Sequence, residues 1–151
     1  MRTRVDVLSP TDDPLYRLMN QGVDRLVKRQ PVVDGVVKNR RRVGDQFYEV
    51  SAPVESRGLF SRGPRVTEVT VERSNFDDEK PCLKLVMGGD GSLSLSFTDG
   101  FERKSDFSVN DLHRARSEGG QKVIEMDNFS QLQPQTRDVL FGEVRKAFFG
   151  I

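Results

Sequence analysis

The sequence predicts an α+β domain: an antiparallel β-meander of about four to six strands, with an N-terminal helix, a short helix and a C-terminal helix packed mainly on one face. Apolar and polar residues alternate through residues 66–97, the pattern of strands with one buried face. Apolar stripes with helical spacing lie near both ends of the chain. The 151 residues match the usual size of one domain, which we place at 1–151.

The first predicted element is a helix that begins after Asp13. Aspartate is a good capping residue, and Pro14 suits the first helical position because its missing N–H costs nothing there. Pro31 predicts the end of this helix. Gly22 is its weak position, at a cost of about 1 kcal/mol relative to alanine. One apolar stripe follows the helical spacing: Leu15, Leu18, Met19, Val23, Leu26 and Val27.

Four segments have strand patterns: 46–52, ended by Pro53, then 66–72, 82–87 and 93–97. Flexible loops are expected at about 31–43 and 55–65. Within the first loop, β-branched pairs flank Asp34-Gly35, which fits either a small hairpin or an irregular excursion.

The turn at Asp99-Gly100 is the sharpest local signal. Asp-Gly suits a type I′ turn, so residues 101–107 are expected to pair back on 93–98. That register sets Phe97 opposite Glu102, which pairs an apolar side chain with a charged one. We therefore expect residues 101–107 to form an edge strand or to contain a bulge.

The C-terminal third is predicted to hold two helices and a strand. Ser108 and Asp111 fit a capping box that opens a short helix through about Ser117, which Gly119-Gly120 can end. A short strand is expected at 122–126. A helix begins at Pro134, with an apolar stripe formed by Leu140, Val144, Ala147 and Phe148.

Residue types that commonly act in catalysis, such as histidine and cysteine, are rare in this sequence. We predict neither a metal site nor a cofactor. His113 is the single histidine, and Cys82 the single cysteine, so one chain lacks the ligands of a structural zinc site. Asp111 precedes His113 by two residues and so faces elsewhere on a helix. An enzyme is therefore disfavoured. A carboxylate-dependent enzyme stays open as the least favoured alternative, with three aspartates as candidates: Asp77, Asp78 and Asp90.

Basic residues gather in the first half of the chain. Up to Arg65 there are 13 Lys and Arg against 8 Asp and Glu, and the remainder holds 11 against 15, for a net charge of +1. Arginines on loops suit phosphate groups, so a nucleic-acid-binding module is the alternative function. The candidate residues are Arg40, Arg41, Arg42, Arg57, Arg62 and Arg65.

Large apolar residues at a loop tip and at the C-terminus form a second candidate surface: Leu59, Phe60, Phe148, Phe149 and Ile151. Such residues dock either on their own domain or on a partner. The leading hypothesis is a non-catalytic binding or adaptor protein that acts through protein–protein contacts, with a homodimer as one possibility. The sequence shows neither a signal peptide nor an apolar membrane span, so the cytoplasm is the expected compartment.

Overall fold

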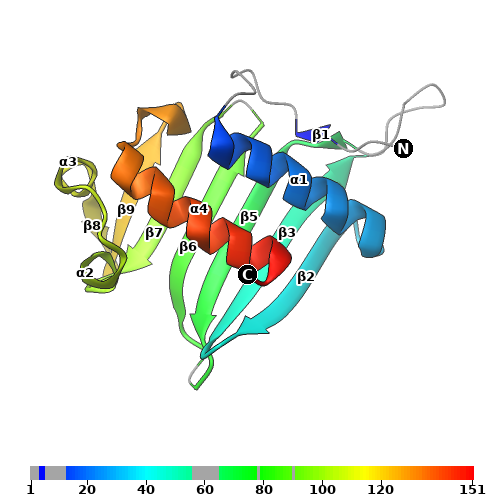
Figure 1. Ribbon diagram of the computed structural model, residues 1–151, viewed down its shortest axis with the longest axis horizontal. Coiled ribbons are helices and arrows are strands. Elements are labelled where there is room, and N and C mark those ends of the chain that lie inside the picture. Colours follow the sequence, from blue (N-terminus) through cyan, green and yellow to red (C-terminus); the bar gives the residue numbers. More distant parts are fainter. Residues whose placement is uncertain (1–3, 6–12, 56–64, 78, 90) are drawn as a thin grey trace.

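Two long helices cover one face of an antiparallel sheet (Figure 1). The computed structural model describes residues 4–5, 13–55, 65–77, 79–89 and 91–151. Helices α1 (Pro14–Arg29) and α4 (Pro134–Phe149) lie side by side on the same face of the sheet, and neither lies on the opposite face. The α+β class and the one-sided packing are confirmed. No helix in these ranges is long and apolar enough to cross a membrane.

The sheet has seven main strands, slightly more than expected. In spatial order they are β2 (Val36–Val43), β3 (Gln46–Glu55), β5 (Glu68–Asn75), β6 (Pro81–Gly88), β7 (Leu93–Thr98), β9 (Gln121–Met126) and β8 (Arg116–Glu118). All of these neighbours pair antiparallel. Two short strands, β1 (Arg4–Val5) and β4 (Arg65–Val66), extend the sheet beside the end of β3.

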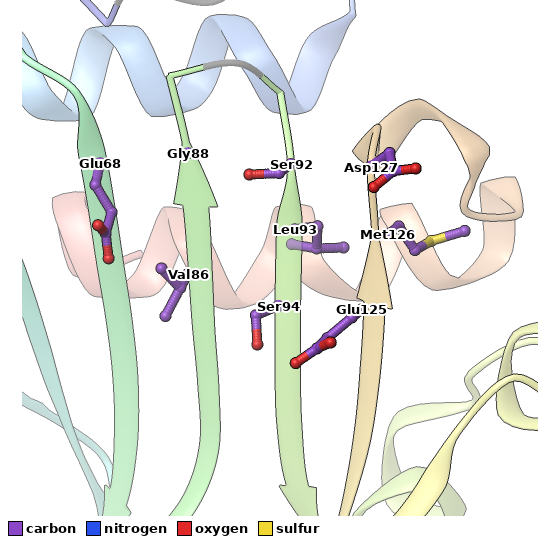
Figure 2. Close-up of a pocket in the computed structure, with 9 residues that line it drawn as sticks. All are labelled: Glu68, Val86, Gly88, Ser92, Leu93, Ser94, Glu125, Met126 and Asp127. Atoms are coloured by element: carbon purple, nitrogen blue, oxygen red, sulfur yellow. The ribbon is translucent and has the colours of Figure 1, made fainter.

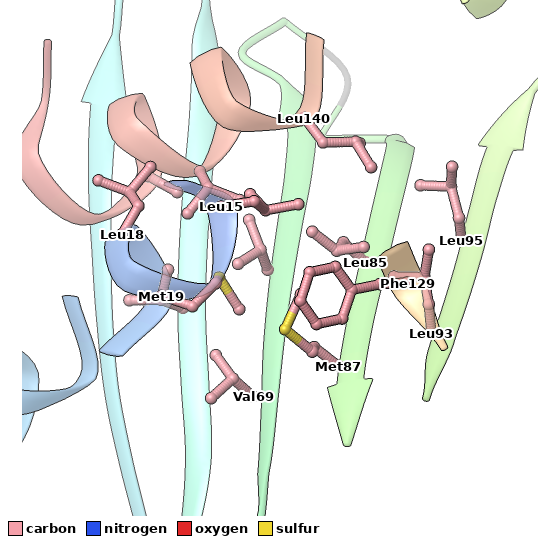
Figure 3. Packing of buried hydrophobic residues seen from close by; sticks show 14 of the residues in the cluster. Leu15, Leu18, Met19, Val69, Leu85, Met87, Leu93, Leu95, Phe129 and Leu140 are labelled. Carbon is pink, nitrogen blue, oxygen red and sulfur yellow. The ribbon is translucent and has the colours of Figure 1, made fainter. Parts of the chain in front are cut away.

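The core lies between the sheet and the two helices. Alternate residues of the strands point into it, because successive strand side chains face opposite sides of a sheet. On β7, for example, Leu93, Leu95 and Phe97 are buried while the serines between them are half-exposed. Figure 3 shows Leu15 and Met19 of α1 and Leu140 of α4 meeting this buried face.

The predicted start of α1 is confirmed. Asp13 Oδ1 accepts a hydrogen bond from the Leu15 backbone N–H at 2.9 Å, and Pro14 occupies the first helical position. The strand expected at 46–52 is also present, but it does not end at Pro53. The Val54 N–H bonds to the carbonyl oxygen of Gly35, just before β2, so the missing N–H of Pro53 faces the opposite side. Pairing with β5 has already ended there, at Ser51, and the proline therefore breaks no ladder bond.

The hairpin predicted at Asp99-Gly100 is wrong. Gly100 (φ +91°) instead leads into the short helix α2 (Phe101–Ser105), and residues 101–107 form no strand. The predicted register would have set Phe97 against a charged residue. The helical turn brings Phe101 and Phe107 onto Phe97 instead, with ring centroids 6.3 and 5.3 Å away. Burial of the aromatic rings thus outweighs the local turn preference of Asp-Gly.

On the side away from β6, β7 pairs with β9, which comes later in the chain and confirms the strand expected at 122–126. Gly119-Gly120 (φ +57° and +81°) forms a two-residue turn with positive φ at both positions, which joins β8 to β9 and does not end a helix. The helix expected through Ser117 is only α3 (Val109–Leu112).

The predicted capping box is wrong as well. The Ser108 side chain makes no cap bond, and its backbone N–H donates to Thr136 Oγ1 of α4 at 2.9 Å. The buried Asp111 carboxylate accepts from the Gln133 N–H, which follows the short 3₁₀ helix η1 (Phe129–Gln131). These two polar residues therefore fix the start of α4 and do not cap α3.

The flexible loop expected at 31–43 contains β2. Gly44-Asp45 closes the β2–β3 hairpin, with Gly44 at φ +60° and Val43 paired with Gln46. Gly35 and Asp34 also have positive φ, in a turn that bridges Val33 to Val36. The strand escaped prediction because five of its eight residues are Lys, Asn or Arg in succession and its apolar residues lie at the ends.

Gly22 allows α1 and α4 to approach closely. A Cβ atom at this position would lie 2.6 Å from two atoms of the Phe148 ring, well inside van der Waals contact. Phe148 is buried at 4% exposure, and the same contact explains why a helix tolerates glycine here.

Replacing Gly22 with alanine tests this contact. Gly22→Ala should lower the free energy of unfolding by about 1 to 3 kcal/mol, because overpacking outweighs the gain in helix propensity. Urea denaturation measures the change. Gly142→Ala is the matched control on α4, where a Cβ atom meets no neighbour within 4 Å, and it should be neutral or stabilising. Equal effects of the two substitutions would contradict the account.

Candidate binding surface

The face of the sheet opposite the helices is mostly polar. Thr70, Ser94 and Ser96 lie on it, and all three are half-exposed. Neither long helix covers this face in Figure 1. The serines of β7 therefore lie on this uncovered side.

The outer edge of β2 is the longest unpaired strand edge among the described residues. β2 has eight residues and pairs with β3 on one side only. The Val54 N–H bonds to Gly35 O, and the alternation of an antiparallel ladder then turns the N–H and C=O groups of Lys38, Arg40 and Arg42 away from β3. The opposite edge, β8, has only three residues. Short edge strands resist pairing, and long ones invite it.

The basic cluster named from the sequence is divided by the strand. Arg40 and Arg42 lie on the uncovered face with Lys38, whereas Arg41 lies on the helix face opposite Tyr48. Arg41 Nη2 donates to the carbonyl oxygen of Phe148 at 2.9 Å. Sequence proximity therefore places these arginines on two different surfaces.

Two arginines of the uncovered face stack on aromatic rings. The Arg40 guanidinium carbon lies 4.1 Å from the Phe47 ring centroid, and that of Arg42 lies 3.6 Å from the Phe76 centroid. The two rings are 5.2 Å apart, and Arg40 also pairs with Glu79 at 3.1 Å. We call Arg40, Phe47, Arg42 and Phe76 the arginine–phenylalanine ladder. The stacking holds the charged groups above the sheet at the edge.

A hollow of about 540 Å³ lies at the far end of the uncovered face, across β5, β6, β7 and β9. Figure 2 shows Ser94 and Val86 on its floor, with Glu68, Glu125 and Asp127 around them. Glu125 pairs with Arg116 at 3.1 Å, and this arginine lowers the pKa of the Glu125 carboxyl. Among the described residues, no group of acidic, histidine or cysteine side chains is arranged to hold a metal ion.

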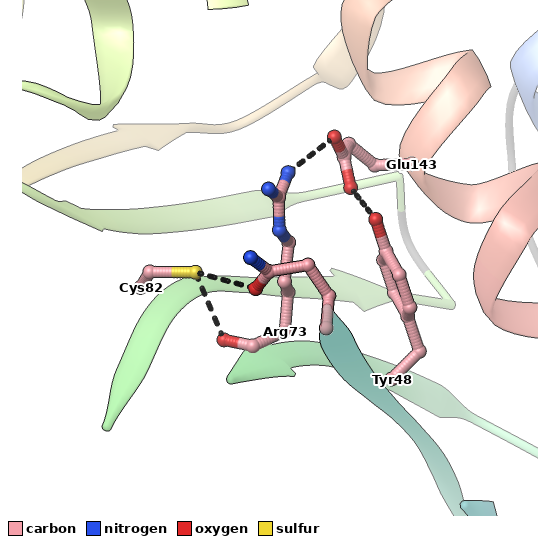
Figure 4. Close-up of polar contacts among 5 residues, drawn as sticks. Tyr48, Arg73, Cys82 and Glu143 are labelled. Atoms are coloured by element: carbon pink, nitrogen blue, oxygen red, sulfur yellow. Dashed lines mark hydrogen bonds and ion pairs between the residues drawn. The ribbon is translucent and has the colours of Figure 1, made fainter. Parts of the chain in front are cut away.

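A polar cluster joins α4 to the sheet beneath the helix (Figure 4). The Tyr48 hydroxyl donates to Glu143 Oε2 at 2.5 Å, and Arg73 Nη1 donates to Glu143 Oε1 at 2.7 Å. Burial, and then the bond to Glu143, raise the pKa of the Tyr48 hydroxyl. Cys82 lies beside the cluster, with its Sγ 3.4 Å from the carbonyl oxygen of Arg73. Each carboxylate oxygen has a donor, so the cluster anchors the helix.

The cluster had one signal in the sequence that we missed. Glu143 follows Leu140 by three positions and precedes Ala147 by four, so it falls within the apolar stripe of the last helix. A charged residue at a core position requires a buried partner. The partner itself could not be named, because Arg73 lies on a distant strand.

The apolar surface expected at the C-terminus is mostly internal. Phe148 is buried against α1, and Phe149 is half-buried beneath Arg25, whose guanidinium carbon is 5.2 Å from the ring centroid. Ile151 is exposed at 70%. Arg65 lies in β4. The other named loop residues lie outside the described ranges: Leu59, Phe60, Arg57 and Arg62.

The residues considered for catalysis do not converge. His113 is exposed at the end of α3, and Asp77 is exposed after β5. Asp78 and Asp90 lie outside the described residues. Glu68 and Glu125, which line the hollow on the uncovered face, were not among the candidates named from the sequence. They meet only because β5 and β9 lie in the same sheet.

Comparison with protein-family models, with curated proteins and with solved structures finds no match to this chain. The function must therefore be argued from the surfaces described above.

The raised pKa of Tyr48 predicts a pH dependence. An ordinary tyrosine ionises near pH 10, where the unfolded state would lose its proton while folded Tyr48 keeps it. Its contribution to stability is therefore full below about pH 10 and falls above it, by about 1.4 kcal/mol per pH unit. Chemical denaturation from about pH 9 to 11 should show a steeper fall for the unmodified chain than for Tyr48→Phe. Parallel curves would contradict the buried hydroxyl.

Proposed function

We propose that this domain is a non-catalytic binding protein that accepts an extended, acidic segment of a partner protein along β2. The observation that carries this proposal is the outer edge of β2, which no other described strand pairs and along which Lys38, Arg40 and Arg42 stand. Only Val36, the first residue of the strand, bonds outward, to Val33. A strand added to such an edge gains main-chain hydrogen bonds, and its alternate side chains meet the residues of one face.

The charge of β2 selects against a second copy of the same strand. Pairing two β2 strands brings their cationic stretches, residues 38–42, close together, and like charges opposed across a ladder are destabilising. An acidic strand meets the same residues with opposite charge. A partner segment rich in Asp and Glu therefore suits the β2 edge better than a second copy of β2 does.

The backbone groups that would bind the segment are already in place. Lys38, Arg40 and Arg42 present N–H and C=O groups outward from an ordered strand whose other side is fully paired with β3. A pre-organised edge reduces the ordering cost to that of the incoming segment alone.

The test uses a fluorescent peptide that matches the eight residues of β2 in length and alternates Glu with Thr. Lys38→Ala removes a charge, whereas Lys38→Pro also removes the outward N–H without touching the β3 ladder. If the peptide adds as a strand, Lys38→Pro should weaken binding about 2- to 10-fold more than Lys38→Ala, as expected for one hydrogen bond. Fluorescence polarisation measures both affinities.

A peptide that alternates Lys with Thr is the ligand control and should not bind. Lys104→Ala, which removes an exposed charge on α2, is the protein control. Equal losses for Lys38→Ala and Lys38→Pro would show attraction by charge alone and would overturn strand addition. Denaturation curves must first show that Lys38→Pro is folded.

Nucleic acid is the second candidate, and the arginine–phenylalanine ladder favours it. Stacked guanidinium planes offer a flat cationic face to a base, and Arg binds phosphate well. Single-stranded oligodeoxythymidine should then bind with a steep salt dependence, and Arg42→Ala should weaken it while Lys38→Pro and Lys38→Ala behave alike. If the oligodeoxythymidine does not bind even at low salt, nucleic acid is ruled out as the ligand.

A further inference from the structure

A small pocket of about 110 Å³ lies where the C-terminal ends of α1 and α4 meet β2 and β3. Three arginines line it: Arg25 and Arg29 from α1, and Arg41 from β2. Gln30 and Asn39 contribute further polar groups to the lining. Helix α1 and strand β2 therefore bring three arginines to the lining of one small volume.

The charge of the pocket is not balanced by the residues that the structure describes. No described carboxylate forms an ion pair with Arg25, Arg29 or Arg41, although the nearby Asp24 pairs with Lys28 at 2.9 Å. Arg41 Nε is buried and has no hydrogen-bond partner. Burial, and the like charges of Arg25 and Arg29, lower the pKa of the Arg41 guanidinium. The three cations thus repel one another across the pocket.

Helix dipoles explain only part of this arrangement. Both helices end here, and each C-terminus carries about half a negative charge, which supports nearby cations. Arg41 also donates to the Phe148 carbonyl oxygen at the end of α4. Two half charges offset about one of the three guanidinium groups. A positive excess remains, together with an unused buried donor.

We infer that this pocket binds a phosphate group, held by Arg25, Arg29 and Arg41. A tetrahedral oxyanion presents several oxygens in different directions, which suits guanidinium groups that arrive from separate elements. The volume accommodates about three or four water molecules at roughly 30 Å³ each, so it fits a phosphate group but no nucleoside. The ligand is either free phosphate or the phosphate end of a larger phosphomonoester.

This site is independent of the proposed strand addition. It lies on the helix face of the sheet, whereas the cations at the peptide edge, Lys38, Arg40 and Arg42, lie on the uncovered face. Either function can fail while the other holds, because the test below contains no peptide and changes no residue used in the peptide experiment.

Titration with inorganic phosphate, followed by the NMR signals of the arginine Nε–Hε groups, tests the inference. At constant ionic strength against chloride, the Arg41 Nε–Hε signal should shift and saturate. Arg25→Gln and Arg29→Gln should each weaken binding about tenfold or more, since a charge-assisted hydrogen bond contributes about 1.5 to 3 kcal/mol. Both substitutions lie on the outer part of α1 and leave Arg41 and its bond to Phe148 in place.

Arg145→Gln is the matched control, because it removes an exposed charge from α4 outside the pocket. It should leave phosphate affinity unchanged. Phosphoserine is titrated in parallel: tighter binding than phosphate assigns the pocket to a phosphomonoester, and weaker binding assigns it to the free ion. A shift that does not saturate, that chloride reproduces, or that persists in the Arg25→Gln, Arg29→Gln double variant overturns the inference.

Discussion

The close contact between the Phe148 ring and Gly22 sets the position of the two helices, and much of the structure depends on it. The contact holds the end of α4 against α1. Asp13 and Arg137 form an ion pair that joins the beginnings of the same two helices. Held at both places, α4 directs Glu143 to Tyr48 and Arg73, and it brings the Phe148 carbonyl oxygen to Arg41 of β2. The helix pair therefore secures the edge strand as well as the core.

One-sided packing explains why the binding surfaces lie where they do. Both helices bury the same face of the sheet, so the opposite face and the β2 edge carry the polar residues of the strands. Arginine serves differently on the two sides. On the uncovered face, Arg40 and Arg42 stack on Phe47 and Phe76. On the helix face, Arg41 has its Nε buried without a partner. A run of three arginines in sequence is thus two sites in space.

The sequence predicts elements whose signals are local and misses those decided by distant partners. Asp13-Pro14 and the alternating strands obey capping and periodicity rules that the fold does not override. The hairpin predicted at Asp99-Gly100 is wrong because burying Phe101 and Phe107 against Phe97 stabilises a helical turn. Gly44-Asp45 is typical of a hairpin turn, but the run of basic residues before it does not have the pattern of a strand, so the β2–β3 hairpin was not predicted. The arginine pocket forms where α1 and β2 meet the end of α4, and a local sequence pattern does not reveal that packing.

The central claim is that β2 is an ordered strand with one side free, and amide hydrogen exchange of the isolated protein tests it most directly. The N–H groups of Val37, Asn39 and Arg41 face β3 and should be protected, whereas those of Lys38, Arg40 and Arg42 face outward and should exchange rapidly. An alternating pattern along these residues is the predicted result. Uniform protection would show that the edge is already covered, uniform rapid exchange would show that β2 is not held as a strand, and either would contradict the account.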